Sequence, residues 1–285
     1  MSSIDLLLNI AGVLLWLNWR SFAFDPLLKS TPATLVGTLK RAEPHRLKRW
    51  QVLTSLGSLL FLRAVLYWQL GSAADWTPKI DLVLVVLPFR INFFESALLY
   101  SLASFARVLA VLYFWLLALA FVNRGMDESE PLHKLVRLQL GRLARLPRLA
   151  QFFLPVVLVT FLWVATNPFL VHASVITTTQ SWSHLLGQGL LISVALYLSL
   201  KYLLPLFLLV HLVISYVYVG RSPVWDYVSA TSQRLLSPLR GLPLRFARID
   251  FGPVIAAVVI LVLLDALPKY LLQRAAQSGS HIWPQ

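Results

Sequence analysis

The chain has 285 residues, of which 58% are hydrophobic and only 13% charged, and its formal net charge is +13. Soluble domains carry about 25% charged residues, so this composition excludes an ordinary soluble domain and predicts a membrane protein. The sequence contains no cysteine. That absence excludes disulfide frameworks, thiolate metal sites and cysteine nucleophiles.

Six apolar runs predict six transmembrane helices, because about 20 helical residues span the roughly 30 Å hydrocarbon core of a bilayer. The first run is short. Asp5 stands at its start and Arg20 follows it, and it has neither a basic start nor a cleavage pattern, which favours a retained helix over a signal peptide. The fifth run is longer than one span needs, which predicts a tilt, a projection beyond the bilayer or a kink at Pro205. The runs are 4–19, 50–70, 97–122, 151–170, 185–219 and 253–272.

Lysine and arginine concentrate in three of the five connections between these runs. Residues 20–49 carry seven, residues 124–148 carry six, and residues 221–248 carry five. By the positive-inside rule these loops are cytoplasmic, which places both termini outside the cytoplasm and predicts a bacterial inner-membrane protein. The second connection includes residues 80–87, which are too few to span and are compatible with a strand, an interfacial helix or a re-entrant piece.

Each basic loop opens on a proline that follows a polar residue: Asp25-Pro26, Glu130-Pro131 and Ser222-Pro223. Proline is favoured at the first position of a helix, and aspartate or serine suits the cap before it. The order helix, basic segment, helix therefore occurs three times. It predicts an all-α fold with one integral membrane domain, 1–285, made of three divergent two-helix repeats at 1–75, 95–172 and 185–275.

The middle basic loop gives the clearest amphipathic helix, over residues 132–149. On a 100° wheel its apolar side chains gather on one side, namely Leu132, Leu135, Val136, Leu140, Leu143 and Leu146. The opposite side carries His133, Lys134, Arg137, Arg145 and Arg148. This pattern predicts a helix at the headgroup boundary whose cations meet anionic lipid headgroups. The alternative is a basic loop that only sets orientation; a nucleic-acid partner is not expected.

Four charged residues interrupt the apolar runs: Arg63, Arg107, Lys201 and Asp265. Charges are expensive in hydrocarbon and are usually paired or functional there. We hypothesise that Asp265 is the counter-ion of Arg63 or Arg107, which would form an ion pair between repeats. The alternative is that each side chain reaches the outer interface separately.

Three histidines, His172, His184 and His211, could lie at membrane depth or at its edge and could bind haem or a pigment metal. His184 and His211 are about 40 Å apart if one helix carries both, so they could not share a metal. The sequence has no phosphate-binding glycine loop, paired-histidine helix motif or nucleophile elbow. We therefore expect no enzymatic activity and no cofactor.

The segment from Ser232 to Leu264 combines a proline-and-arginine stretch, a loop proline and an Ile-Asp pair before an apolar helix. It resembles the signature of the YggT (YlmG) family of small membrane proteins, although the family usually has serine where this chain has Gly252. The resemblance covers about a third of the chain, and the family typically has one or two repeats rather than three. The matching positions are Pro238, Arg240, Pro243, Asp250, Gly252 and Pro253.

What the resemblance implies is a membrane role without an agreed biochemical activity. Members are associated with cell division and nucleoid placement, with osmotic tolerance and with maturation of a haem-carrying cytochrome b. We expect a non-enzymatic protein that organises or helps to assemble a membrane complex, together with a membrane-protein partner or as a homo-oligomer. The alternatives are a transport or osmotic-adaptation component, with Arg63, Arg107 and Asp265 lining a polar route, and an accessory subunit of a haem- or pigment-bearing complex.

Overall fold

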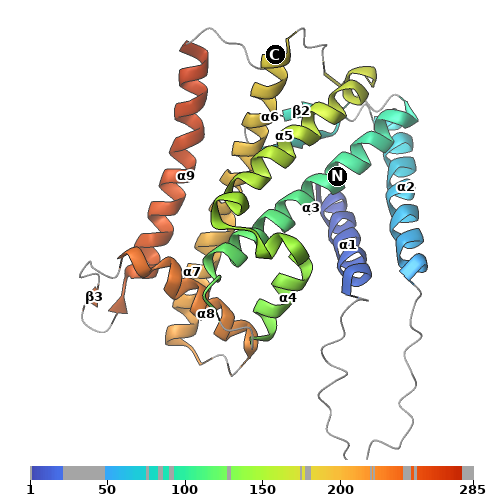
Figure 1. The fold of residues 1–285 in the computed structure, drawn as a ribbon. Coiled ribbons are helices and arrows are strands. Elements are labelled where there is room, and N and C mark those ends of the chain that lie inside the picture. The colour runs from blue at the N-terminus through green and yellow to red at the C-terminus, as the bar shows by residue number, and fades with distance from the viewer. Residues whose placement is uncertain are drawn as a thin grey trace, which may run out of the picture. The chain divides into compact units, whose positions relative to one another are not determined.

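The computed structural model of the chain describes residues 2–21, 49–74, 77–82, 86–89, 93–126, 130–173, 175–176, 181–218, 220, 222–239, 245–246 and 249–277. Helices make up most of these residues (Figure 1). The α-helices are α1 (Ser2–Ser21), α2 (Arg49–Ala74), α3 (Phe94–Val122), α4 (Pro131–Leu140), α5 (Arg148–His172), α6 (Trp182–Leu198), α7 (Leu200–Tyr216), α8 (Pro223–Leu235) and α9 (Gly252–Gln277). The remaining elements are the 3₁₀ turns η2 (Gly141–Arg145) and η3 (Ser237–Leu239) and the strands β1 (Lys79–Asp81), β2 (Val86–Pro88), β3 (Arg245–Phe246) and β4 (Ile249–Asp250).

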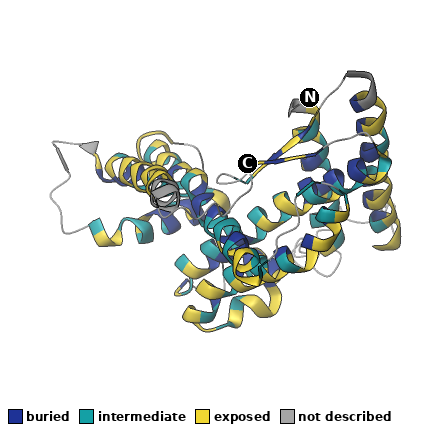
Figure 2. Ribbon diagram, turned by 90° about the horizontal axis from the view of Figure 1, so that it is seen from above, coloured by how far each residue is buried: buried dark blue, intermediate teal, exposed yellow. Residues whose placement is uncertain are grey.

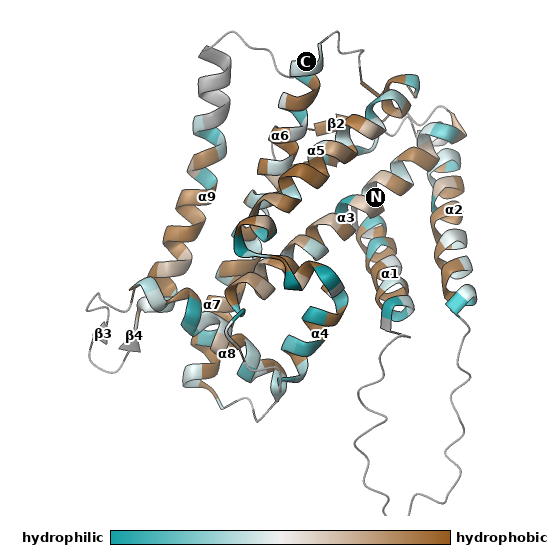
Figure 3. Ribbon diagram, viewed as in Figure 1, coloured by the Kyte–Doolittle hydropathy of each residue, from teal (hydrophilic) through white to brown (hydrophobic). Residues whose placement is uncertain are grey.

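Five helical segments in the described part of the chain are long and apolar enough to cross a membrane. They are Arg49–Gly71, Phe94–Val122, Arg148–His172, Trp182–Tyr216 and Gly252–Tyr270, and their apolar residues dominate the long helices of Figure 3. The chain is thus a helical protein with the spans of an integral membrane protein, as predicted. Helix α1 has 20 residues but does not belong to the five. A sixth span therefore stays a prediction.

Contacts divide the chain into two compact units. Unit 1 contains Met1–Ile80 and Pro88–Leu109, and unit 2 contains Asp81–Leu87 and Ala110–Gln285. Helix, basic segment and helix follow one another as α3, α4, α5 and again as α7, α8, α9. The single domain and the three repeats nevertheless stay predictions, because element order alone does not establish common structure.

In unit 1, α1 packs along α2. Leu56 and Leu60 of α2 form a buried apolar cluster with Phe105 of α3, and Trp16 of α1 packs against it. After α2 the chain forms strands β1 and β2, which pair in a two-stranded sheet. Of residues 80–87, Ile80 and Asp81 lie in β1 and Val86 and Leu87 lie in β2, whereas residues 83–85 lie outside the described part of the chain.

In unit 2, α5 packs along α6, whereas α7 packs along α9 and α8. A second apolar cluster joins the end of α3 to α4 and α8. Its buried members include Leu117 and Ala120 of α3, Val136 and Leu140 of α4, and Tyr227 of α8. The two helices of the basic loops thus share a core with a membrane-spanning helix.

The long fifth run is interrupted at Ser199, where α6 ends and α7 begins. Pro205, where a kink was one of three alternatives for this run, lies inside α7. Proline has no N–H and cannot close the helical bond to the residue four positions earlier, so some adjustment near it is expected. The Ser199 hydroxyl bonds to the Leu196 carbonyl (2.6 Å) and accepts the indole N–H of Trp115 (3.0 Å), which holds the interruption against α3.

Many large apolar side chains on the spanning helices lie on the protein surface, as Figure 2 shows by the exposed residues along the ribbons. Phe161 of α5 and Val262 and Leu263 of α9 are examples. So many exposed large apolar side chains are uncommon on soluble monomers. It is the surface that a helix presents to lipid.

Candidate functional site

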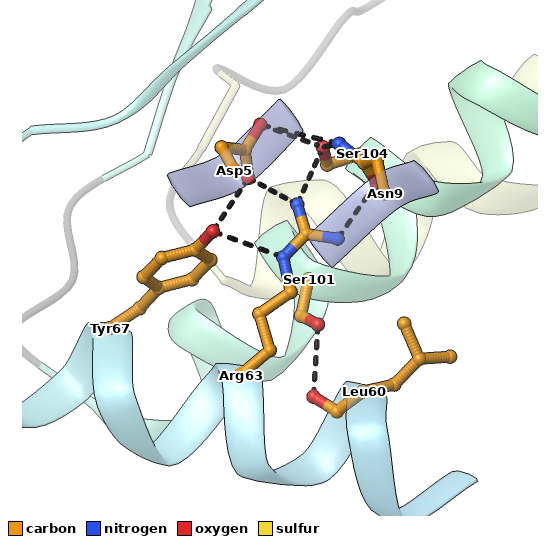
Figure 4. Close-up of polar contacts among 7 residues, drawn as sticks. All are labelled: Asp5, Asn9, Leu60, Arg63, Tyr67, Ser101 and Ser104. Atoms are coloured by element: carbon orange, nitrogen blue, oxygen red, sulfur yellow. Dashed lines mark hydrogen bonds and ion pairs between the residues drawn. The ribbon is translucent and has the colours of Figure 1, made fainter. Parts of the chain in front are cut away.

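Three helices of unit 1 each present polar side chains at helical spacing to one buried point (Figure 4). Helix α1 supplies Asp5 and Asn9, α2 supplies Arg63 and Tyr67, and α3 supplies Ser104. Positions four residues apart lie on the same face of a helix, so each pair acts together. We call these five residues the Arg63 cluster.

The guanidinium of Arg63 is the centre of the cluster, and its side chain is 0% exposed. Its Nε donates to the Tyr67 hydroxyl (3.1 Å), and its Nη1 donates to the amide oxygen of Asn9 (2.9 Å). Its Nη2 donates to the Ser104 hydroxyl (2.8 Å) and forms an ion pair with the Asp5 carboxylate. All three guanidinium nitrogens therefore bind groups of the protein itself.

The Asp5 carboxylate is equally well satisfied. One of its oxygens accepts from Arg63 and from the Tyr67 hydroxyl (2.6 Å), and the other accepts from the Asn9 amide (3.4 Å). Burying a charge is costly unless it is paired and hydrogen-bonded, and removing one partner of such a pair costs about 3–5 kcal/mol. The cluster therefore has the contacts of a structural joint between α1, α2 and α3.

This arrangement corrects the hypothesis that Asp265 is the counter-ion of Arg63. Arg63 is paired with Asp5, whereas Asp265 of α9 contacts Lys269 one turn later (3.1 Å) and Lys201 of α7 (3.7 Å). Arg107 lies exposed on α3. Asp5 escaped sequence reasoning because it stands at the start of the first apolar run, where a carboxylate is usually taken as a flanking residue. The signal was its spacing of four residues from Asn9.

The basic segment of unit 2, residues 131–149, departs from the predicted continuous helix. Helix α4 ends at Leu140, and Gly141 has φ = 58°, a left-handed conformation that glycine adopts readily. A 3₁₀ turn follows. A single helical wheel for residues 132–149 therefore does not describe the residues after Gly141. Leu143, for example, is exposed rather than buried.

His133 was predicted to lie on the polar, lipid-facing side, and this prediction is wrong. Its side chain is 0% exposed and lies on the buried face of α4 with Val136 and Leu140. Positions three and four apart on a helix share a face, so the burial of Val136 and Leu140 brings His133 with it. The face covers Tyr227 of α8.

The cations of the basic segment are mostly on the surface. Lys134, Arg145 and Arg148 are exposed and Arg137 is half-buried, and Arg142 is a further exposed cation that the wheel did not single out. Exposed leucines stand between them, namely Leu135, Leu138, Leu143 and Leu149. The same surface thus carries positive charge and apolar side chains, the combination found on segments at a membrane interface.

Hydrogen-bonded contacts of unit 2 fix the position of this segment and of α8, on which it packs. The Gln151 side-chain amide of α5 donates to the carbonyls of Leu143 (3.2 Å) and Ala144 (3.0 Å) in the 3₁₀ turn. The Asn123 amide, just beyond α3, donates to the Thr231 hydroxyl of α8 (2.7 Å). Sequence reasoning missed both, because isolated polar residues at helix ends carry no spacing signal.

A polar seam joins α5 and α6. The indole N–H of Trp163 donates to the side-chain oxygen of Gln188 (3.3 Å), and the hydroxyls of Thr160 and Ser193 bond to each other (3.3 Å). Gly189 brings the two backbones close at this point. Small and polar side chains at helix contacts are typical of membrane helix pairs, because apolar burial supplies little driving force between helices in lipid.

The positions that resemble the YggT signature lie around the start of α9. Pro238 is in η3, Asp250 ends β4 and pairs with Arg245 of β3, and Gly252 and Pro253 are buried at the first turn of α9. Arg240 and Pro243 lie outside the described residues. The Glu130-Pro131 and Ser222-Pro223 starts are confirmed, since α4 begins at Pro131 and α8 at Pro223. Asp25-Pro26 lies outside the described residues.

Comparisons with family models, with curated proteins and with solved structures found no match for this chain. The resemblance to the YggT family therefore stays a prediction, and the function has to be argued from the Arg63 cluster and from the basic segment.

Proposed function

We propose that the chain is a non-enzymatic membrane protein that organises or helps to assemble a membrane complex, and that its basic segment, residues 131–149, binds anionic lipid headgroups. The observation that carries this proposal is the surface of that segment. Its exposed cations Lys134, Arg142, Arg145 and Arg148 alternate with exposed leucines. Each basic residue near an anionic membrane surface adds about 1 kcal/mol of attraction.

The way the segment is held supports this role. Its buried face packs on α8, and Gln151 ties its 3₁₀ turn to the first turn of α5. The basic segment is thus held at the ends of apolar helices rather than on a free loop. A positioned cationic surface binds headgroups with less loss of conformational entropy than a disordered tail does.

The proposal keeps the orientation expected from the charge distribution, with the basic segment on the cytoplasmic side and both termini outside. The YggT-like motif around α9 is a second, weaker support for a role in membrane organisation. The transport alternative needed Arg63, Arg107 and Asp265 to line one route. The contacts of the described residues give it no support, because Arg63 is bound to Asp5 and Asp265 contacts Lys201 and Lys269.

The test measures thermal unfolding of the full chain in lipid nanodiscs that contain either zwitterionic phosphatidylcholine alone or a mixture with anionic phosphatidylglycerol. We expect the anionic lipid to raise the unfolding temperature at low salt and the gain to shrink as salt increases. The triple variant Arg142→Gln, Arg145→Gln, Arg148→Gln should lose most of the gain.

The matched control is the double variant Lys201→Gln, Lys269→Gln, which removes cations elsewhere in unit 2 and should keep the response to anionic lipid. An equal response in the triple variant and the wild type would contradict the lipid-binding role. For the assembly role, affinity purification from native membranes should recover a stoichiometric partner. Recovery of a homo-oligomer alone would argue against it.

A further inference from the structure

We infer that α1 crosses the membrane only as a dependent helix, and that Arg63 of α2 holds it there by neutralising Asp5. This inference goes beyond the proposed lipid binding, because it concerns unit 1 and how that unit is built in the bilayer. It rests on three features of the described residues: the composition of α1, the burial of Arg63 and the contacts of Asp5.

Helix α1 is long enough to span, because its 20 residues extend about 30 Å. Its first turn, however, carries an acidic residue. Asp5 and Asn9 place a carboxylate and an amide on one face of it. A charged residue within a span is unfavourable in hydrocarbon, so α1 by itself is a poor candidate for independent insertion.

Helix α2 carries the complementary problem. It belongs to the five apolar segments, yet Arg63 lies within its span and its side chain is fully buried. An arginine at the end of a span can extend to water, but Arg63 points instead to Asn9, Ser104 and Asp5. Helix α1 thus carries the negative charge and α2 the positive charge of one ion pair, and the pair as a whole is neutral.

The rest of the interface fits this dependence. Gly12 of α1 lies against the Phe105 ring of α3, where an added Cβ would stand 2.8 Å from a ring carbon. Ser101 of α3 donates to the Leu60 carbonyl of α2 (2.9 Å). Small side chains at these contacts allow close approach of the three helices around the buried pair.

The test places single cysteines in this cysteine-free chain, either at position 2 by Ser2→Cys or at the start of α2 by Trp50→Cys. The chain is synthesised without cells in the presence of membrane vesicles, so that molecules are scored whether or not they fold. A membrane-impermeant maleimide then reports the side on which each cysteine lies. If α1 spans, the two positions label from opposite sides, whichever way the protein is oriented.

We expect opposite sides in the wild-type background and in Asp5→Leu, whose α1 is apolar enough to insert alone. Arg63→Leu leaves Asp5 unpaired, and we expect the fraction of molecules with the two positions on opposite sides to fall several-fold. The double variant Asp5→Leu, Arg63→Leu should restore that fraction. A general loss of packing would lower the fraction of molecules with the two positions on opposite sides equally in Asp5→Leu and Arg63→Leu. A role in insertion lowers it in Arg63→Leu only.

Arg107→Leu is the control, since it removes an exposed cation of α3 that is not one of the five residues of the Arg63 cluster, and it should leave the fraction unchanged. The inference is overturned if Arg63→Leu keeps the two cysteines on opposite sides in all molecules. It is also overturned if the double variant fails to recover, or if Arg107→Leu gives the same loss as Arg63→Leu.

Discussion

Asn123, the residue after α3, donates a hydrogen bond of 2.7 Å to the hydroxyl of Thr231 on α8, and both side chains are 0% exposed. The Thr231 hydroxyl in turn bonds to the carbonyl of Tyr227 one turn earlier (2.7 Å). This short chain of hydrogen bonds fastens the amphipathic helix α8 to the end of a membrane-spanning helix.

Thr231→Val should therefore destabilise unit 2. Valine has the same shape but leaves the buried Asn123 amide without this acceptor, and an unsatisfied buried donor costs about 1–3 kcal/mol. Chemical denaturation in detergent micelles measures the free energy of unfolding. Thr166→Val on the exposed face of α5 is the matched control and should change little, because the Thr166 hydroxyl bonds only within its own helix. Equal values for the two variants would contradict the fastening role.

Tyr227 makes the same contact sensitive to alkaline pH. Burial raises the pKa of the Tyr227 hydroxyl above its ordinary value of 10.0. A folded-state pKa above the unfolded one contributes stability that is complete below the unfolded pKa and is lost as pH rises through the folded pKa. We expect the unfolding temperature of the wild type to fall as the pH rises above about 10, and that of Tyr227→Phe to fall less steeply. Identical slopes would show that Tyr227 does not titrate in this transition.

Gly189 should be the most restrictive small residue of the α5–α6 seam. A Cβ there would lie 3.0 Å from the Thr160 Cα and 2.9 Å from its methyl carbon, and the backbone contact cannot be relieved by a rotamer change. Gly189→Ala should cost about 1–3 kcal/mol of unfolding free energy. Gly57→Ala on α2 is the control, because nothing lies within 4 Å of its Cβ position, and it should be neutral or stabilising by about 0.5–1 kcal/mol. A stable Gly189→Ala variant would mean that α5 and α6 are farther apart than described.

Hydrophobicity alone predicted the long helices, since four of the apolar runs from 50–70 onward fall within one described helix and the run 185–219 covers most of α6 and α7. The two proline-marked starts at Pro131 and Pro223 were also predictable, because proline and its cap act locally. The break at Ser199 was not, since it depends on the Trp115 indole of another helix. Periodicity describes a helix but not what it packs on, which is why His133 was assigned to the wrong face.

The candidate site was predictable only in part, for a related reason. Arg63 stood out as a charge in an apolar run, but the choice of its partner required knowing that α1 packs on α2. Asp5 lies 58 residues away in sequence. The cations of the basic segment could be located from the sequence, because their exposure follows from local charge. Gln151 could not, because its role depends on the 3₁₀ turn that Gly141 begins.

Gln151→Leu should release the 3₁₀ turn of the basic segment. The substitution removes the two hydrogen bonds to the Leu143 and Ala144 carbonyls, and we expect a loss of about 1–2 kcal/mol. The side chains of Arg142 and Arg145 are already exposed, but local opening also makes the backbone beside them accessible to trypsin. Cleavage there should accelerate several-fold while cleavage at Arg234 stays constant. Limited proteolysis with mass spectrometry of the fragments measures each site. A uniform acceleration at all sites would indicate global unfolding and contradict a local role.

The ion pair of the Arg63 cluster gives the sharpest stability prediction, because two partners for Arg63 can be compared in one experiment. Arg63→Leu leaves the half-buried Asp5 carboxylate without its cation and should cost up to about 3–5 kcal/mol. The double variant Asp5→Leu, Arg63→Leu replaces the pair by apolar side chains and should recover most of that loss.

The double variant Arg63→Leu, Asp265→Leu serves as the comparison. Asp265 contacts Lys201 and Lys269, so its removal should add its own small change to that of Arg63→Leu and restore nothing. The coupling energy from the two double-mutant cycles decides between the partners. A large coupling of Arg63 with Asp265, together with none between Arg63 and Asp5, would refute the Arg63 cluster as described. The expected outcome is the reverse, because every side-chain nitrogen of Arg63 is engaged by Asp5, Asn9, Tyr67 or Ser104.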